Sequence, residues 1–184
     1  MSALPDEAYV MALSLLPGVG PARLSALLAL DDPPGVWHSV AAGDRRVVQA
    51  AGRADRAVAW RSAAGAVDVG ERWAELRRNG IGLLWRRGAG FPAPLVEDPE
   101  PPEVLFARGD AGCLAAQRVA IVGTRRCTRY GRDLAYELGA LLADADVTVV
   151  SGLARGIDAA AHRGALDAGG AGPVAVVGTA IDTP

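Results

Sequence analysis

The sequence predicts a two-part α/β protein: a small all-α domain over residues 1–80, then over residues 81–184 an open, doubly wound parallel sheet whose core begins at about residue 118. Three observations lead to this prediction. Residues 5–79 repeat apolar side chains at the helical period, runs of buried-strand composition alternate with helical segments after residue 118, and a Pro-rich stretch joins the two parts. Because open sheets of this kind usually have about five or six strands, we expect the sheet to be incomplete within this chain.

The helical part is expected to consist of short amphipathic helices separated by turns. The apolar spacing predicts helices over residues 6–16, 21–30, 47–64 and 69–78, with turns at residues 17–20 and 31–35. We expect the four tryptophans to fill the core or pack between the two parts rather than to form a platform for stacked bases. They are Trp37, Trp60, Trp73 and Trp85.

The turn at residues 17–20 has the form of a helix-hairpin-helix motif. Gly18 and Gly20 would let backbone amides approach a phosphate at the start of the second helix, and Arg23 would lie close to it. An αα-hairpin that only packs would use the same Gly-rich turn, so both interpretations stay open.

The rest of the chain is predicted to alternate strands and helices. Two short strands, at residues 81–85 and 104–107, flank a Pro-rich connector. Beyond it the expected order is β-α-β-α-β, with strands at residues 119–122, 147–150 and 174–177 and helices at residues 130–143 and 158–168. Strands that are apolar along their whole length are typical of a parallel sheet with helices on both faces, which favours a doubly wound sheet.

The composition excludes several classes of function. Apolar residues make up 51% of the 184 residues, and 19 basic against 21 acidic side chains give a formal net charge of −2. All the Lys and Arg positions are Arg, so chemistry that needs a lysine amine is excluded. Two cysteines and two histidines are too few for a disulfide framework or a structural zinc site. With no basic leader and no apolar run of about 20 residues, we expect a cytoplasmic protein with no membrane contact, metal or cofactor.

The first candidate binding site is the loop that follows the first core strand. A strand-to-helix turn in a parallel sheet directs backbone N–H groups and the positive end of the helix toward bound anions. Glycine allows close approach of a phosphate, threonine hydroxyls can donate hydrogen bonds, and an arginine can grip phosphate with its bidentate fork. The candidates are Gly123, Thr124, Arg125 and Thr128. Arg126 and Arg129 either join this site or stay in solvent, and the loop lacks the GxGxxG pattern of dinucleotide sites.

The second candidate site follows the next core strand. Two such turns on neighbouring parallel strands would open onto one groove, where small residues keep the rim low and a second arginine adds charge. The candidates are Ser151, Gly152, Arg155, Gly156 and Asp158. Asp158 and His162 are four residues apart on one helix face. A local brace is favoured over a catalytic pair because no nucleophile accompanies them.

These motifs resemble those of the DNA-processing protein A (Smf) family. The resemblance is carried by RVAIVGTR at residues 118–125, SGLARGID at residues 151–158, and the Ala161-His162 pair. Residues 98–110 resemble the entry into that family's extended Rossmann-like domain, and residues 1–80 resemble its SAM-like helical domain more loosely. In the stretch TAIDTP at residues 179–184, Ala180 stands where the family commonly has Gly.

The resemblance implies a cytoplasmic bacterial protein that binds single-stranded DNA, protects incoming strands during natural transformation and helps to load the RecA recombinase. It implies no catalysis, no cofactor and a homodimer when the protein is full length. The residues of the two loops would then hold the DNA backbone. The rest of the sheet, a further basic contact, the dimer and RecA surfaces and any winged helix would follow Pro184.

Two other functions are compatible with the sequence. Related Rossmann-like enzymes of the nucleoside-monophosphate phosphoribohydrolase type cleave nucleotides in a similar crevice, and their glycine-rich motif with its catalytic Glu would also lie beyond Pro184. A helical interaction module joined to a ligand-sensing Rossmann-like domain would bind nucleotides tightly and have no affinity for oligonucleotides. We expect DNA binding rather than either alternative.

Overall fold

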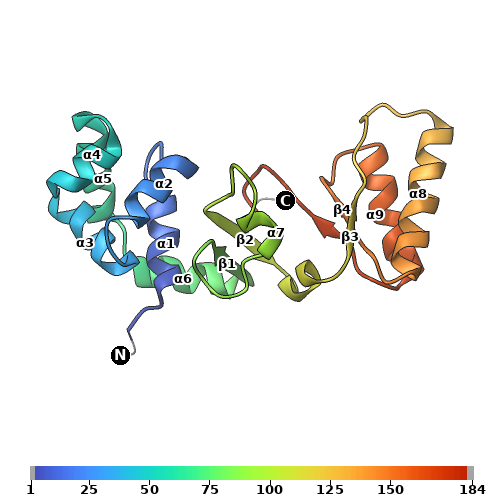
Figure 1. The fold of residues 1–184 in the computed structure, drawn as a ribbon, viewed down its shortest axis with the longest axis horizontal. Helices are drawn as coiled ribbons and strands as arrows, with labels where there is room; N and C mark the ends of the chain where they lie inside the picture. Colours follow the sequence, from blue (N-terminus) through green and yellow to red (C-terminus); the bar gives the residue numbers. More distant parts are fainter. Residues whose placement is uncertain (1–2, 182–184) are drawn as a thin grey trace. The chain divides into compact units, whose positions relative to one another are not determined.

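The computed structural model describes residues 3–181 and divides the chain into two compact units, Met1–Gly109 and Asp110–Pro184, each considered by itself (Figure 1). The sequence departs from the resembled family in the stretch at residues 179–184. The end of this stretch, residues 182–184, lies outside the described residues. The change of character predicted near residue 80 falls inside the first unit. The strand that starts there packs on two of the helices and contributes Leu83 and Trp85 to their core.

The first unit begins with a run of short helices. They are α1 (Asp6–Ser14), α2 (Pro21–Leu28), α3 (Pro33–Ala42), α4 (Arg45–Ala51), α5 (Ala54–Ala66) and α6 (Val69–Arg78). The predicted turn at residues 31–35 is wrong in its second half, where α3 begins: Asp32 accepts a hydrogen bond from the Gly35 amide at 2.7 Å, and Pro33 occupies the first helical position. The single helix predicted over residues 47–64 is also wrong, because α4 ends at Ala51 and α5 starts at Ala54.

The core of the first unit is built from the apolar faces of these helices. Val10, Met11, Leu27 and Trp60 are completely buried in it. Trp37 and Trp85 are also buried and Trp73 is partly buried against the same core, so the packing role predicted for the tryptophans is confirmed. The Trp60 Nε1–H donates a hydrogen bond to the Pro17 carbonyl at 2.9 Å, which ties α5 to the turn between α1 and α2.

Replacing Trp60 with Phe is expected to lower the free energy of unfolding of this unit by about 0.5 to 1.5 kcal/mol more than replacing Trp37 with Phe. Both changes remove the same atoms from a buried indole, but only Trp60→Phe breaks the hydrogen bond to the Pro17 carbonyl. Urea denaturation followed by tryptophan fluorescence measures both losses. Equal losses in the two variants would show that the hydrogen bond to Pro17 contributes nothing.

The first unit ends in an antiparallel pair of strands. In this pair β1 (Ile81–Trp85) lies beside β2 (Val104–Arg108), with Leu83 opposite Phe106. The two short strands predicted at residues 81–85 and 104–107 are thus confirmed. The Pro-rich connector between them contains a short helix, α7 (Ala93–Val96).

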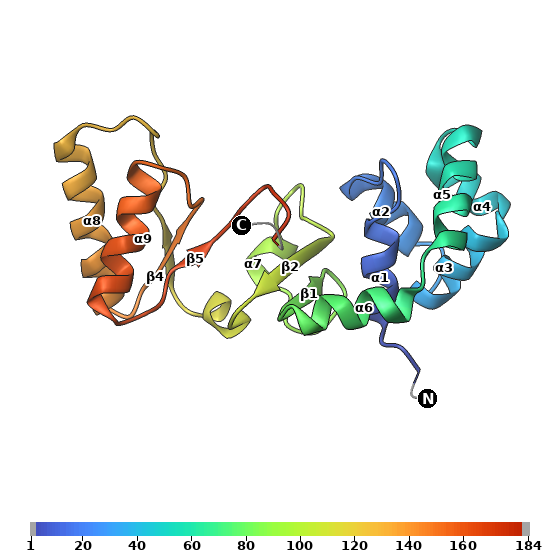
Figure 2. The same ribbon diagram turned by 180° about the vertical axis from the view of Figure 1, so that it is seen from behind.

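The second unit is a three-stranded parallel sheet with two helices. A 3-10 turn, η1 (Ala111–Ala115), precedes β3 (Arg118–Ala120), α8 (Arg129–Asp144), β4 (Thr148–Ser151), α9 (Ile157–Ala168) and β5 (Val174–Ala175). The strand order is β3-β4-β5 and both pairings are parallel, so the predicted α/β class is confirmed. Because both crossovers run in the same direction, α8 and α9 lie on one face of the sheet (Figure 2).

The helices α8 and α9 pack unusually closely. A Cβ atom at Gly164 would lie 2.0 Å from the Tyr136 carbonyl oxygen, and one at Gly139 would lie 2.2 Å from the Ala161 carbonyl oxygen. Buried Ala161 and Val149 complete the small core between these helices and the sheet. Within residues 3–181, no helix has the length and apolar character needed to cross a bilayer.

Candidate nucleic-acid interface

Two loops meet at the carboxyl ends of β3 and β4. The first, residues 121–128, leads from β3 into α8, and the second, residues 152–156, leads from β4 into α9. The buried Asp158 carboxylate, in the first turn of α9, joins them: one oxygen accepts a hydrogen bond from the Gly123 amide at 3.1 Å and the other accepts from the Gly152 amide at 3.2 Å. Asp158 therefore braces both loops.

The two loops also touch directly. Gly156 has φ +94°, and a Cβ atom there would lie 2.3 Å from the Thr124 carbonyl oxygen, so both its backbone conformation and its surroundings require glycine. A Cβ atom at Gly123 would lie 2.6 Å from Cγ1 of Ile157, whose amide donates to the Thr124 carbonyl at 3.3 Å. The two predicted candidate loops therefore form one packed surface.

The predicted hydroxyl donors differ in what they can still offer a ligand. The buried Ser151 hydroxyl donates to the Ile121 carbonyl at 2.6 Å, so its proton is already used. Thr124 Oγ1 accepts from the Arg126 amide at 3.2 Å, and Thr128 caps α8 by accepting from the Gly131 amide at 3.1 Å. A hydroxyl that accepts from an amide can still donate its own proton, so both threonines can serve a phosphate.

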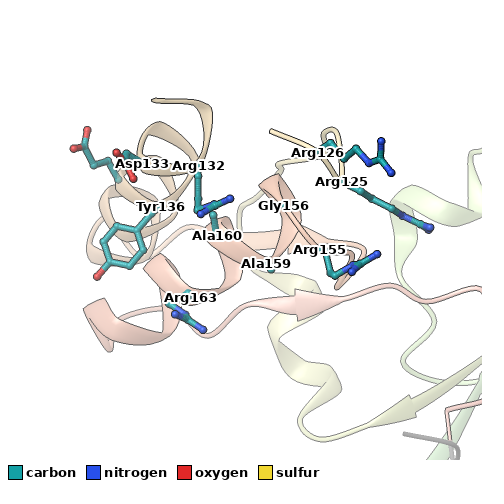
Figure 3. Close-up of a pocket in the computed structure, with 11 residues that line it drawn as sticks. Arg125, Arg126, Arg132, Asp133, Tyr136, Arg155, Gly156, Ala159, Ala160 and Arg163 are labelled. Atoms are coloured by element: carbon teal, nitrogen blue, oxygen red, sulfur yellow. The ribbon is translucent and has the colours of Figure 1, made fainter. Parts of the chain in front are cut away.

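A cavity of about 1000 Å³ opens beside the two loops and continues between α8 and α9. Figure 3 shows that its arginines come from the loops and from both helices. They are Arg125, Arg126, Arg132, Arg155 and Arg163. Among the described residues, none of these five guanidinium groups has an ion pair or hydrogen bond with a protein acceptor. They are charged groups whose hydrogen-bonding capacity is available to an anion.

The sequence left open whether Arg126 and Arg129 belong to the site, and the cavity lining gives a different answer for each. Arg126 lines the cavity, whereas Arg129 is 95% exposed, lies 3.7 Å from the Asp133 carboxylate and is not part of the lining. Arg132 and Arg163 were missed in the sequence because only the loops were considered. Their positions on the helices carry a signal, since Arg132 precedes Tyr136 by four residues and Arg163 follows Ala159 by four, which places each pair on one helix face.

The cavity has acidic and aromatic groups as well. Asp133 and Glu137 line it, so the lining has five positive against two negative side chains. The Tyr136 hydroxyl donates to the Asp167 carboxylate at 3.0 Å, and this hydrogen bond to the neutral phenol, together with the negative charge of Asp167, raises the pKa of Tyr136. The phenol is therefore uncharged near neutral pH, where it does not repel a phosphate.

Asp158 and His162 do not form a hydrogen-bonded pair in the described part of the chain. Both Asp158 oxygens are taken by the amides of Gly123 and Gly152, as the brace interpretation requires. His162 is buried, and its Nε2 has no hydrogen-bond partner among residues 3–181. The Asp158–His162 pair considered in the sequence is therefore not formed.

The helix-hairpin-helix turn of the first unit is held by hydrogen bonds to two of its carbonyl oxygens. Arg23 Nη1 donates to the Gly18 carbonyl at 3.3 Å, and Trp60 holds the Pro17 carbonyl. Gly20 is the N-cap residue of α2 and has open space around it. At the start of α2, Pro21 has no amide hydrogen and the Arg23 amide donates to the Gly20 carbonyl at 3.0 Å, which leaves the Ala22 amide for a ligand. The predicted phosphate ligand Arg23 folds its side chain back onto its own loop.

Taken by itself, the second unit is an α/β domain of Rossmann-like topology with a cationic cavity at the carboxyl ends of its strands. The profile of the family described as DNA recombination-mediator protein A matches residues 83–184. The chain belongs to this family.

Curated relatives carry names related to DNA processing. The chain is 51% identical over 85 residues to a DNA processing protein DprA of Mycobacterium tuberculosis, covering 45% of this chain and 22% of that protein. It is 39% identical over 92 residues to DNA processing protein DprA of Streptococcus pneumoniae, covering 50% of this chain and 32% of that protein. Protein Smf of Escherichia coli is 37% identical over 93 residues, covering 50% of this chain and 25% of that protein. The matched segment thus spans a third or less of each of these relatives.

A solved structure shares the fold. The X-ray structure of DNA processing protein A from Streptococcus pneumoniae superimposes with a TM-score of 0.74 and 23% sequence identity, over 100% of this chain and 61% of that one. The similarity confirms the fold predicted from the sequence.

Proposed function

We propose that this chain binds single-stranded DNA by its sugar-phosphate backbone and acts in recombination, including natural transformation, as a mediator and not as an enzyme. The observation that carries the proposal is the cluster of five arginines without protein partners beside two rigidly braced loops. An arginine fork recognises phosphate geometry, whereas the net charge of −2 gives the whole molecule no general affinity for polyanions.

The proposal includes the cellular role that the family suggests. In the natural protein, bound strands are protected in the cytoplasm and passed to the RecA recombinase, and the full-length protein acts as a homodimer. The names of the family and of its relatives, which refer to recombination mediation and DNA processing, support this role. Contacts to the backbone carry little sequence information, so we expect at most a slight sequence preference.

The absence of catalysis is part of the proposal. The Ser151 hydroxyl, at the end of β4, uses its proton on the Ile121 carbonyl. The Asp158 carboxylate, which braces the two loops, uses both oxygens on backbone amides. These engagements support a binding function for the loops, because general-base work needs a free acceptor within reach of the substrate.

Replacing Arg125 with Ala is expected to weaken binding of labelled oligo-dT by about 1 to 3 kcal/mol, the size of a charged hydrogen-bonded contact. Fluorescence anisotropy at two salt concentrations, with a duplex of equal length alongside, measures affinity and strand preference. Arg45→Ala is the matched control, because Arg45 is an exposed arginine on α4 of the other unit. Unchanged affinity in a folded Arg125→Ala variant would remove Arg125 from the site. A folded chain that binds nucleoside monophosphates but no oligo-dT would contradict the proposed function.

A further inference from the structure

The cationic cavity extends beyond the two loops along the surface of the helices. Figure 3 shows Arg125, Arg126 and Arg155 gathered near the loops, while Arg132 and Arg163 lie farther along α8 and α9. We call the part of the cavity lined by Arg132, Tyr136, Ala159 and Arg163 the α8–α9 groove. A single phosphate held at the loops would leave the arginines of this groove without an anion.

We infer that the bound strand continues from the loops into the α8–α9 groove, where Arg132 and Arg163 hold a second stretch of its backbone. This inference rests on the proposed function, and it specifies the class of ligand: a polynucleotide strand with successive phosphates rather than a mononucleotide. The groove contains arginines from two different helices with no acidic partner in the described part of the chain. Two acids of α8, Asp133 and Glu137, also line the cavity, and Asp133 is paired with Arg129, so Arg132 and Arg163 outnumber the remaining acid, Glu137.

The groove also offers a surface for a base. Tyr136 lines it, and the hydrogen bond from its hydroxyl to Asp167 on α9 fixes the far end of the ring. Stacking on an aromatic ring accepts any base, which suits a site that reads no sequence. The floor beneath it is formed by Ala159 and Ala160, whose short side chains leave the groove open.

The number of phosphates that each part of the cavity neutralises can be measured from the salt dependence of the binding constant. For single strands, the slope of log K against log salt is about −0.7 for each phosphate neutralised, so each contact contributes about fivefold in affinity at 0.1 M salt. The double variant Arg132→Ala/Arg163→Ala is expected to make the slope for a 20-nucleotide oligo-dT shallower by about 1.4 and to weaken binding about 25-fold at 0.1 M salt. Replacing both residues with Lys, which keeps the charge, should restore the slope.

The control is Arg45→Ala/Arg53→Ala, which removes the same charge from exposed positions of the other unit. If the wild-type chain binds oligo-dT and Arg125→Ala weakens binding, but the groove variant keeps the wild-type slope, the groove inference is wrong and the proposed function stands. If the folded wild-type chain does not bind oligo-dT, the proposed function fails and the inference fails with it. A slope that changes equally in the control and the groove variants would also overturn the inference.

Tyr136 gives a second, salt-independent readout. Tyr136→Ala is expected to weaken oligo-dT binding about tenfold, whereas Tyr136→Phe, which keeps the ring and loses only the hydroxyl, should retain most of the affinity. An oligonucleotide without bases should bind the wild-type and Tyr136→Ala chains equally. Equal loss in the Phe and Ala variants would show that the hydroxyl, and not the ring, matters, which would contradict stacking in the groove.

Discussion

Replacing Asp158 with Ala is expected to lower the free energy of unfolding of the second unit by about 3 kcal/mol, because two backbone amides lose the same charged acceptor at once. The carboxylate is 3% exposed and accepts from the amides of Gly123 and Gly152, which belong to different loops. Hydrogen exchange measured peptide by peptide should show a loss of protection of up to about a hundredfold in β4 and α9. Binding of oligo-dT should fall as well, since both loops lose their common support.

Asp133→Ala is the matched control for this prediction. Asp133 lies in the second turn of α8 and pairs with Arg129, but its side chain is 61% exposed, so its removal should change stability by only about 0.5 kcal/mol or less. A stability loss in Asp158→Ala no larger than in Asp133→Ala would contradict the brace. Asp158→Asn should lie between the two, because the amide keeps one acceptor oxygen and turns a donor toward a backbone N–H.

Replacing Gly164 with Ala is expected to destabilise the second unit by about 3 kcal/mol, although the substitution adds a single methyl group. That methyl carbon would lie 2.0 Å from the Tyr136 carbonyl oxygen, which is backbone and moves only if α8 and α9 separate. The groove between these helices should change shape as they separate, so binding of oligo-dT should weaken in parallel. Far-UV circular dichroism during urea denaturation measures the loss of stability.

Gly65→Ala supplies the contrasting case. Gly65 lies in α5 with nothing within 4 Å of an added Cβ, so alanine there should stabilise the helix by about 0.5 to 1 kcal/mol through its better helix propensity. The same substitution is thus expected to act with opposite signs at two helical glycines. If Gly164→Ala also stabilised the protein, the close approach of α8 and α9 would have to be wrong.

The parts of the fold that could be predicted are those with a strong local pattern. The apolar strands and the glycine-rich turns that follow them predict the parallel sheet and both candidate loops, because strand composition and turn chemistry are local properties. The α3 helix was missed because the two prolines at its start suggest a turn, whereas Pro33 at the first helical position after Asp32 is a helix-start signal. The helix predicted across Gly52 was too long because apolar spacing continues through the break.

The chemistry of the site was harder to predict than its location. The loops were found from their sequence, but the hydrogen bond from Gly123 to Asp158 spans 35 residues, and no local pattern encodes such a contact. The hydrogen bond from Gly152 to Asp158 spans only six. Arg132 and Arg163 were missed for a similar reason. Each faces the same cavity only because α8 and α9 pack side by side, at positions where glycines permit close contact.

The brace at Asp158 also has a kinetic consequence. Loops that must be ordered by a ligand slow its capture, because only a fraction of encounters finds the loops in the competent arrangement. Here the amides of Gly123 and Gly152 are already held by one carboxylate, and Gly156 packs against Thr124. We therefore expect oligo-dT to associate in a single step at a rate set by diffusion and electrostatic attraction, so that the rate constant falls as salt is added.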